Sequence, residues 1–127
     1  MIYTTYSIVA CDLEEKAWGV AVASKFLACG AAVSWAEAAS GAIATQALVK
    51  VGFGPQGLSI LASGNSSAET LAKLLASDPR SEDRQLAIVD TQGEVSAYTG
   101  TQCYDWAGHK TGIHFSCQGN MLTGPET

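Results

Sequence analysis

A hydroxyl group and an ammonium group are expected to lie close together at one end of the first hairpin of this chain. The first predicted strand, residues 4–11, carries Thr5 near its start, and the second, residues 18–24, ends at Ser24 and runs into Lys25. An antiparallel pair brings these two ends together. A nearby ammonium favours the alkoxide-like form of a hydroxyl, and a deprotonated lysine can act as a base. The pattern predicts either a nucleophilic Thr5 with Lys25 as its activating cation, or two strand ends without chemistry.

Five sequence blocks carry a resemblance that extends over nearly the whole chain, namely residues 5–10, 19–28, 41–47, 106–109 and 118–122. In composition and order they resemble the bacterial and archaeal family known as domain of unknown function 1028. That family is similar in fold to the N-terminal-nucleophile (Ntn) hydrolases, which are four-layer αββα sandwiches whose first strand carries the nucleophile. Because the substrate of the family is not established, the resemblance implies a fold and leaves the chemistry to the residues.

Thr5 occupies the position that matches the leading threonine of the family. In Ntn hydrolases the α-amino group of the nucleophile, freed by cleavage, acts as the base, because its pKa near 8 suits proton transfer at neutral pH. Here residues 1–4 precede Thr5, and removal of Met1 alone would leave Ile2 at the terminus. Either a further cleavage exposes Thr5, or an uncleaved chain relies on Lys25 or another base.

Other candidates for the site lie further along the chain. The backbone N–H groups of Ala44 and Thr45 follow small residues and could stabilise an oxyanion, although the same stretch also suits tight β-packing. Asn120 could donate to the oxyanion or orient the nucleophile, or it could be a loop asparagine with local backbone bonds. Ser24 and His109 are the remaining candidates for substrate contact, with a surface loop as the alternative for His109.

The cysteines predict neither disulfides nor a metal site. The chain has four cysteines and no CxxC pair, so free thiols in a reducing compartment are expected. Four residues of types that bind zinc fall close together, namely Cys103, His109, His114 and Cys117. Their spacing does not match the usual structural zinc patterns, so no metal or cofactor is expected. A weaker alternative for catalysis is a cysteine nucleophile at Cys11 or Cys29.

Composition narrows the possible partners. Seven basic and twelve acidic residues give a net charge of -5 with no basic run, which argues against nucleic-acid binding. No signal peptide or membrane span is evident, so a cytoplasmic protein is expected. Because 47% of residues are apolar and 15% are charged, we expect a homo-oligomer or a partner that covers apolar surface.

Local signals define a sequence of strands, helices and strands. Two short strands are expected within residues 34–45, followed by a helix from Pro55 to residue 63 that Gly64 ends. The Ser66–Glu69 spacing predicts a capping box at the start of a second helix up to residue 78. Further strands are expected at residues 85–90, 94–98 and 114–118.

This order predicts an α+β fold that matches the N-terminal half of a four-layer αββα Ntn-hydrolase-like sandwich with antiparallel sheets. Residues 1–127 are expected to form a single domain that is incomplete at its C-terminal end, because members of the family continue further. Two helices cover only one face of such a sandwich. We therefore expect a completing C-terminal half, a second chain or another copy of this chain.

The function predicted from these residues is hydrolysis of a C–N bond, in an amide or cyclic amide of a small metabolite. Thr5 would be the nucleophile, Lys25 the activating cation, and Ala44, Thr45 and Asn120 the oxyanion donors. The alternative is a non-catalytic oligomeric binding protein that keeps an Ntn-like shell, which the residues before Thr5 favour.

Overall fold

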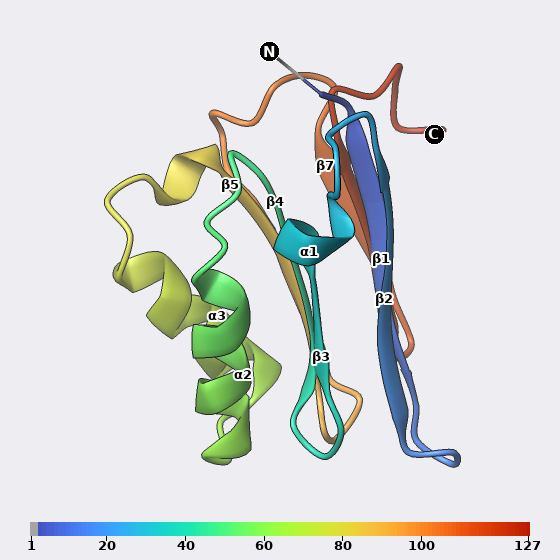
Figure 1. Cartoon of the computed structure of the whole chain (residues 1–127), viewed down its shortest axis with the longest axis vertical. Helices are drawn as coiled ribbons and strands as arrows, with labels where there is room; N and C mark the ends of the chain where they lie inside the picture. Colours follow the sequence, from blue (N-terminus) through green and yellow to red (C-terminus); the bar gives the residue numbers. More distant parts are fainter. Residues whose placement is uncertain (1–2) are drawn as a thin grey trace.

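The computed structural model describes residues 3–127 and contains two four-stranded antiparallel sheets (Figure 1). Sheet A has the order β2 (Ala17–Ser24), β1 (Thr5–Asp12), β8 (Phe115–Asn120) and β7 (Gly108–Gly112). Sheet B has the order β3 (Ser34–Glu37), β4 (Gly41–Ala47), β5 (Arg84–Asp90) and β6 (Val95–Thr99). These sheets confirm the predicted mixed α+β class with antiparallel pairing.

The helices lie on one side of this pair of sheets. α2 (Phe53–Ala62) and α3 (Ser67–Ala76) cover the face of sheet B that points away from sheet A (Figure 1). α1 (Gly30–Val33) and a 3₁₀ turn (Ser81–Asp83) are shorter. Within residues 3–127 the layers are therefore helices, sheet B and sheet A, and no helix covers the other face of sheet A.

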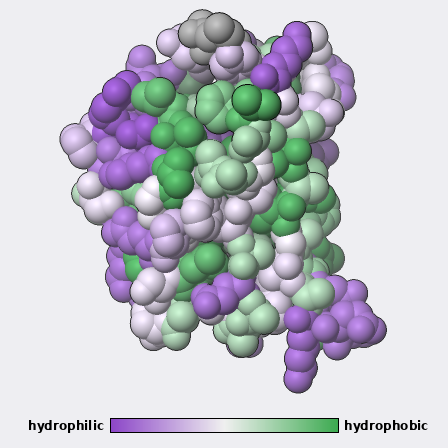
Figure 2. Space-filling view, in the orientation of Figure 1, coloured by the Kyte–Doolittle hydropathy of each residue, from purple (hydrophilic) through white to green (hydrophobic). Residues whose placement is uncertain are grey.

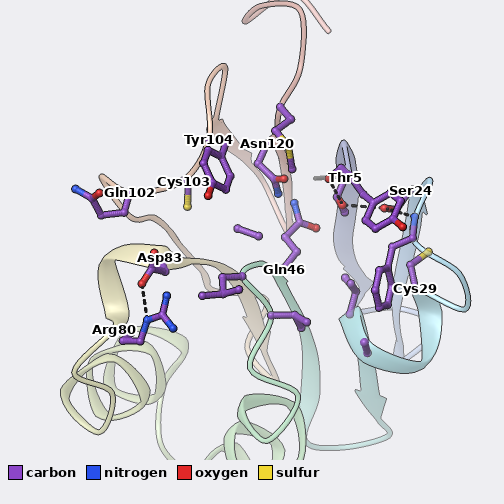
Figure 3. A pocket seen from close by; sticks show the side chains of 18 residues that line it. Thr5, Ser24, Cys29, Gln46, Arg80, Asp83, Gln102, Cys103, Tyr104 and Asn120 are labelled. Atoms are coloured by element: carbon purple, nitrogen blue, oxygen red, sulfur yellow. Dashed lines mark hydrogen bonds and ion pairs between the residues drawn. The ribbon is translucent and has the colours of Figure 1, made fainter. Parts of the chain in front are cut away.

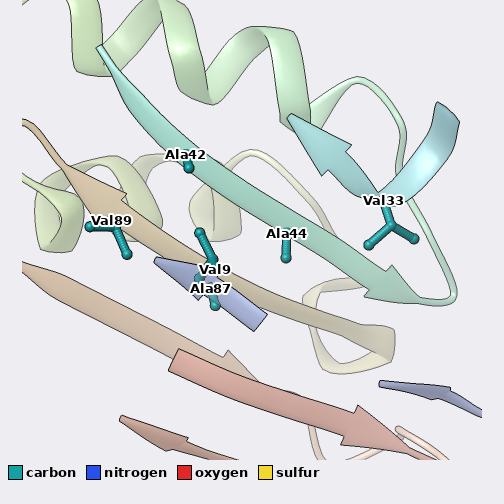
Figure 4. Packing of buried hydrophobic residues seen from close by; sticks show 6 residues of the cluster. All are labelled: Val9, Val33, Ala42, Ala44, Ala87 and Val89. Carbon is teal, nitrogen blue, oxygen red and sulfur yellow. The ribbon is translucent and has the colours of Figure 1, made fainter. Parts of the chain in front are cut away.

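Alternation along β1 explains how sheet A packs on sheet B. Thr5, Ser7 and Val9 are buried, whereas Tyr6 and Ile8 between them are exposed. A period of two is the signature of a strand with one buried face. The core between the sheets contains small side chains, which are Val9, Val33, Ala42, Ala44, Ala87 and Val89 (Figure 4).

Helix α2 packs closely on sheet B because glycines stand at its contact points. A Cβ atom at Gly54 would lie 2.2 Å from the Trp35 ring, and one at Gly57 would lie 2.4 Å from Ile43 Cδ1. Absence of a side chain therefore compensates for the low helix propensity of glycine here. The second core, on the helix side, is made of Ile43, Phe53, Leu61, Leu74, Leu86 and Ile88.

Several predicted boundaries are confirmed and others need correction. The capping box is present, because the Glu69 backbone N–H donates to Ser66 Oγ and the Ser66 N–H donates to the Glu69 carboxylate. Helix α2 begins at Phe53 rather than at Pro55, and Gly64 follows its end with a φ of 93°.

Three further elements differ from the prediction. Helix α1 was not predicted, because its short Gly-Ala-Ala-Val run has no periodicity. Strand β7 was not predicted either, because Gly-His-Lys-Thr-Gly has no apolar alternation and is held by pairing with β8. The last strand was expected at residues 114–118 and spans Phe115–Asn120. His114 adopts a φ of 63° in the turn before the strand, and Met121 adopts a φ of 53° directly after it.

The surface differs between the β1–β2 turn and the uncovered face of sheet A. The charged residues Asp12, Glu14, Glu15 and Lys16 make the turn hydrophilic, at the lower right of the space-filling view (Figure 2). On the uncovered face, Tyr6 is 55% exposed and Ile8 is 39% exposed. Among residues 3–127, no helix has both the length and the apolar character needed to cross a membrane.

Candidate functional site

A cavity of about 430 Å³ lies where β1 begins and where β2, β4 and β8 end. This volume is in the range of small-molecule sites. Figure 3 shows Thr5, Ser24 and Cys29 on one side, Arg80, Asp83, Cys103 and Tyr104 on the other, and Gln46 and Asn120 between them. The cavity wall therefore combines apolar side chains, neutral polar side chains and one pair of opposite charges.

The pairing of sheet A places three polar residues side by side. Thr5 is the direct register partner of Ser24 on β2 and of Asn120 on β8. Residues directly opposite each other in adjacent strands point to the same face. All three side chains consequently lie on the face of sheet A that meets sheet B, at the cavity end.

Thr5 and Ser24 form a hydroxyl pair. Thr5 Oγ1 lies 2.9 Å from Ser24 Oγ, which also donates to the Thr4 carbonyl at 3.0 Å and accepts from the Phe26 N–H at 3.1 Å. Because a serine hydroxyl has one proton, donation to the Thr4 carbonyl leaves Ser24 Oγ as an acceptor for Thr5. Thr5 Oγ1 also lies 3.4 Å from the Tyr3 carbonyl, and Ser24 Oγ at 2.9 Å is the nearer of its two acceptors. The Thr5 hydroxyl is thus held in a defined direction, and its residue is only 7% exposed.

A chain of amides lies beneath this hydroxyl pair. Ser7 Oγ donates to Gln46 Oε1 at 2.7 Å and accepts from Gln118 Nε2 at 2.6 Å. Gln46 Nε2 and Asn120 Nδ2 both donate to Gln85 Oε1, at 2.8 and 3.1 Å. These five residues are buried, and they connect sheet A to sheet B by hydrogen bonds rather than apolar contacts. Hydrogen-bonded networks of buried side chains fix side-chain geometry.

The opposite wall carries the charged pair and a thiol. Arg80 Nε donates to Asp83 Oδ2 at 2.9 Å, and 62% of the Arg80 side chain is exposed. Cys103 Sγ donates to the Arg84 carbonyl, and burial raises the pKa of the Cys103 thiol. A raised pKa keeps the thiol protonated and weakens it as a nucleophile.

Backbone conformation at the rim is unusual. Ala47 and Met121, which both line the cavity, adopt φ values of 66° and 53°. Left-handed backbone is uncommon for residues with a side chain and occurs often at functional sites. The ends of β4 and β8 are therefore held in conformations that regular strands do not require.

The structure brings only some of the predicted site residues together. Thr5, Ser24 and Asn120 lie next to one another at the cavity. Lys25 follows Ser24 but is exposed, and within residues 3–127 it forms no ion pair and does not line the cavity. It therefore lies outside the described wall of the cavity.

The oxyanion candidates on β4 lie deeper than predicted. Ala44 packs in the core between the sheets, and Thr45 is fully buried on the next position of the strand. Neither is among the described residues that line the cavity, whereas Gln46 and Ala47 are.

His109 lies away from the cavity. It is on β7, where its Nδ1 is 2.9 Å from Thr99 Oγ1, and partial desolvation lowers its pKa. It borders a groove on the other side of sheet A with Trp106 and Tyr6.

The residues proposed for a cysteine nucleophile or a zinc site lie in different parts of the structure. Cys11 is near the end of β1 opposite the cavity, and burial raises the pKa of its thiol, whereas Cys29 lines the cavity. All four cysteines are free thiols. Within residues 3–127, no three histidine, cysteine or acidic residues are grouped so that they could hold a metal ion.

Sequence reasoning missed the three glutamines that support the site. Gln46, Gln85 and Gln118 each stand at a buried, inward position of a strand. A long amide at a buried strand position must find partners for both its ends. Their recurrence on three strands was the available signal.

The comparisons with known proteins agree on a family and leave its activity open. A family model described as "Family of unknown function (DUF1028)" matches residues 5–127. The crystal structure of protein SPO2555 from Silicibacter pomeroyi, assigned to the same family model, superposes with a TM-score of 0.92 at 31% identity. That match covers 97% of this chain and 55% of the other, so this chain spans about half the length of its solved relative. No curated protein matches the sequence.

Proposed function

Since this chain belongs to the DUF1028 family, whose function is unknown, we propose from its cavity that it hydrolyses a C–N bond in a small amide or cyclic amide. One observation carries the proposal. The Thr5 hydroxyl is hydrogen-bonded to Ser24 at 2.9 Å on the wall of a cavity of small-molecule size. An oriented hydroxyl at a concave site is what nucleophilic catalysis requires.

In the proposed reaction, Thr5 Oγ1 attacks the carbonyl carbon and forms an ester, while the C–N bond breaks. The base takes the hydroxyl proton and returns it to the leaving nitrogen, and water then hydrolyses the ester. The proposed base is the α-amino group of Thr5, exposed by removal of residues 1–4, as in Ntn hydrolases. The described residues of the cavity wall include no histidine or lysine, which supports an amine supplied by the nucleophile itself.

Oxyanion stabilisation is proposed at the end of β4. The sequence pointed to the backbone of Ala44 and Thr45, and the cavity is lined two positions later, at Gln46 and Ala47. An N–H donor must lie near the position that the oxyanion occupies. The exposed Lys25 is kept as the base of an uncleaved chain only.

The proposal includes a four-layer Ntn-like sandwich for the complete protein. The three layers of the described residues and the uncovered face of sheet A support it. A completing C-terminal half or a second chain would supply the fourth layer. The proposed partner of the cavity is a small molecule.

Intact-mass measurement of the protein from its native cells, combined with a Thr5→Ala variant, tests this function. We expect the active protein to have lost residues 1–4. Thr5→Ala should abolish hydrolysis in a screen of small amides, with an unchanged melting temperature. The matched control is Thr4→Ala, which changes a residue that processing removes. Retention of Ile2 in the active protein, or hydrolysis by Thr5→Ala at the parental rate, would refute the mechanism.

A non-catalytic binding protein is the second candidate. It is favoured by the residues that precede Thr5 and by the Thr4 carbonyl that accepts from Ser24, since both leave Thr5 without an amino-terminal base. For this candidate, the mature mass would include residues 2–4. Thr5→Ala would then change the Kd of the ligand, and neither the parental protein nor the variant would hydrolyse it.

A further inference from the structure

Asn120 is a buried amide of which only one end is satisfied. Its Nδ2 donates to Gln85 Oε1 at 3.1 Å, whereas its Oδ1 has no hydrogen-bond partner among the described residues. We infer that Asn120 Oδ1 accepts a hydrogen bond from the ligand, so that the cavity selects amides carrying at least one N–H. The inference rests on the proposed function for the substrate class and adds a rule of selectivity to it.

The orientation of the amide chain is fixed by backbone carbonyls. Gln85 Nε2 donates to the Gly119 carbonyl at 2.8 Å and to the Gly108 carbonyl at 3.0 Å. Because a carbonyl oxygen accepts only, the NH₂ end of Gln85 must be the end that faces these two groups. The Oε1 end of Gln85 therefore faces the opposite way.

The fixed orientation of Gln85 determines that of Asn120. Gln85 Oε1 accepts hydrogen bonds from Gln46 Nε2, at 2.8 Å, and from Asn120 Nδ2. Gln46 Nε2 also donates to the Gln118 carbonyl at 3.3 Å, so it cannot be reversed without loss of both bonds. Reversal of the Asn120 amide would place its oxygen against Gln85 Oε1. The Asn120 oxygen is consequently held away from the network.

Asn120, the residue that carries this buried oxygen, belongs to the cavity wall. Asn120 is 1% exposed, lines the cavity and is the register partner of Thr5 (Figure 3). A buried carbonyl oxygen without a donor is unfavourable, and a ligand N–H beside the nucleophile would supply the donor. The sequence suggested Asn120 as a donor to an oxyanion, whereas the network uses its Nδ2 donor and leaves its Oδ1 acceptor unpaired.

The neighbourhood favours a neutral donor over an ammonium. The side chains of Thr5, Ser24 and Gln46 around Asn120 carry no charge, the freed α-amino group of Thr5 must be neutral to act as the base, and the charges of Arg80 and Asp83 are paired on the opposite wall. An ammonium placed beside Asn120 would lose hydration without a carboxylate to replace it. Primary and secondary amides therefore fit the site, whereas esters and tertiary amides leave Asn120 Oδ1 unpaired.

A matched pair of ligands tests this selectivity for an N–H through binding alone, without a measurement of hydrolysis. N-methylbutanamide and N,N-dimethylbutanamide share a carbonyl and an acyl chain and differ in the N–H. NMR titrations that follow Thr5, Gln46 and the side-chain NH₂ of Asn120 give a Kd for each. We expect the N–H amide to bind about fivefold more tightly, as a single neutral hydrogen bond implies. Equal affinities, tighter binding of the tertiary amide, or no binding of either amide at this cavity would overturn the inference.

Two variants test whether Asn120 causes the preference for an amide that carries an N–H. Asn120→Leu should remove the difference between the two amides, and Asn65→Leu, the same change at the start of α3 and outside the cavity wall, should keep it. The comparison on the parental protein stands even if Asn120→Leu fails to fold. If Thr5→Ala retains full activity while the N–H preference remains, the proposed nucleophile is wrong and the selectivity rule holds. If Thr5→Ala is inactive and the preference is absent, the rule is wrong and the nucleophile holds.

Discussion

At the scale of single residues, the direction of the hydrogen bond between Thr5 and Ser24 depends on what precedes Thr5. In the described chain, Ser24 gives its proton to the Thr4 carbonyl and accepts from Thr5, whose other acceptor, the Tyr3 carbonyl, is farther away at 3.4 Å. Removal of residues 1–4 would take this carbonyl away and leave the Ser24 proton available to Thr5 Oγ1. A donor at that oxygen stabilises its alkoxide-like form. Processing would thus activate the nucleophile through Ser24 as well as through the freed amine.

Ser24→Ala tests this role of the serine. We expect kcat to fall at least about tenfold, because a hydrogen bond to a charged oxygen contributes about 1.5 kcal/mol or more, with KM little changed. The measurement is steady-state hydrolysis of the best substrate from the amide screen, with melting temperature as the check on folding. Ser59→Ala on the exposed surface of α2 is the matched control and should behave like the parental protein. A Ser24→Ala variant as active as that control would remove Ser24 from the mechanism.

At the scale of elements, an ion pair joins the end of α3 to the start of β5 behind the cavity. Arg84 Nε donates to Asp78 Oδ2 at 2.7 Å, and the side chains are 10% and 4% exposed. The Arg84 guanidinium also donates to the Leu48 carbonyl, and Lys50 lies 3.5 Å from the Asp78 carboxylate. Since Leu48 lines the cavity, this pair holds one of its walls.

The same pair predicts a loss of stability in acid. Hydrogen bonding to Arg84 is the main cause that holds the pKa of Asp78 below its usual value. A lowered folded-state pKa stabilises the protein above the unfolded pKa of about 3.9, and this contribution is lost as the pH falls through the folded value. Urea unfolding at several pH values should therefore show a decline below about pH 4 that Asp78→Asn reduces.

Asp78→Asn should also cost about 1.5–3 kcal/mol at pH 7, because it weakens hydrogen bonds to a buried charged group. The matched control is Asp105→Asn at an exposed position. Equal acid profiles for the parental protein and Asp78→Asn would show that other carboxyl groups determine the decline.

At the scale of the whole molecule, the face of sheet A that no described helix covers carries exposed apolar side chains. Tyr6, Ile8 and Phe115 on this face are 55%, 39% and 38% exposed. Tyr6 and Ile8 share β1, and Phe115 on β8 pairs with Ala10, the next outward position of β1 after Ile8. Contiguous apolar surface of this kind commonly marks an interface. We expect a completing polypeptide or a second copy to cover it.

Ile8→Glu tests this expectation. The chain by itself should self-associate, and the variant should weaken the association because it places a charge in the contact. Native mass spectrometry or light scattering gives the oligomeric state. Leu13→Glu is a matched control, because Leu13 is 38% exposed but lies in the β1–β2 turn. A folded, soluble monomer of the unmodified chain without a companion would contradict the expectation.

The sequence by itself determined the elements whose signals are local. The Ser66–Glu69 capping box, the alternation along β1 and the stop at Gly64 depend on neighbours within a few residues. They could be predicted because helix caps and strand faces follow from short-range hydrogen bonding and burial. The same local reasoning brought Thr5 and Ser24 together, since a hairpin joins them.

Only the tertiary structure decided the composition of the site. Asn120 reaches Thr5 because β8 pairs with β1 across more than a hundred residues, and β7 exists because β8 pairs with it. Gln85 and Gln46 meet Asn120 across the gap between the two sheets. Which amide end each residue presents depends on the partners that long-range packing provides. For this reason the sequence could nominate Asn120, but only the folded network made its oxygen the available acceptor.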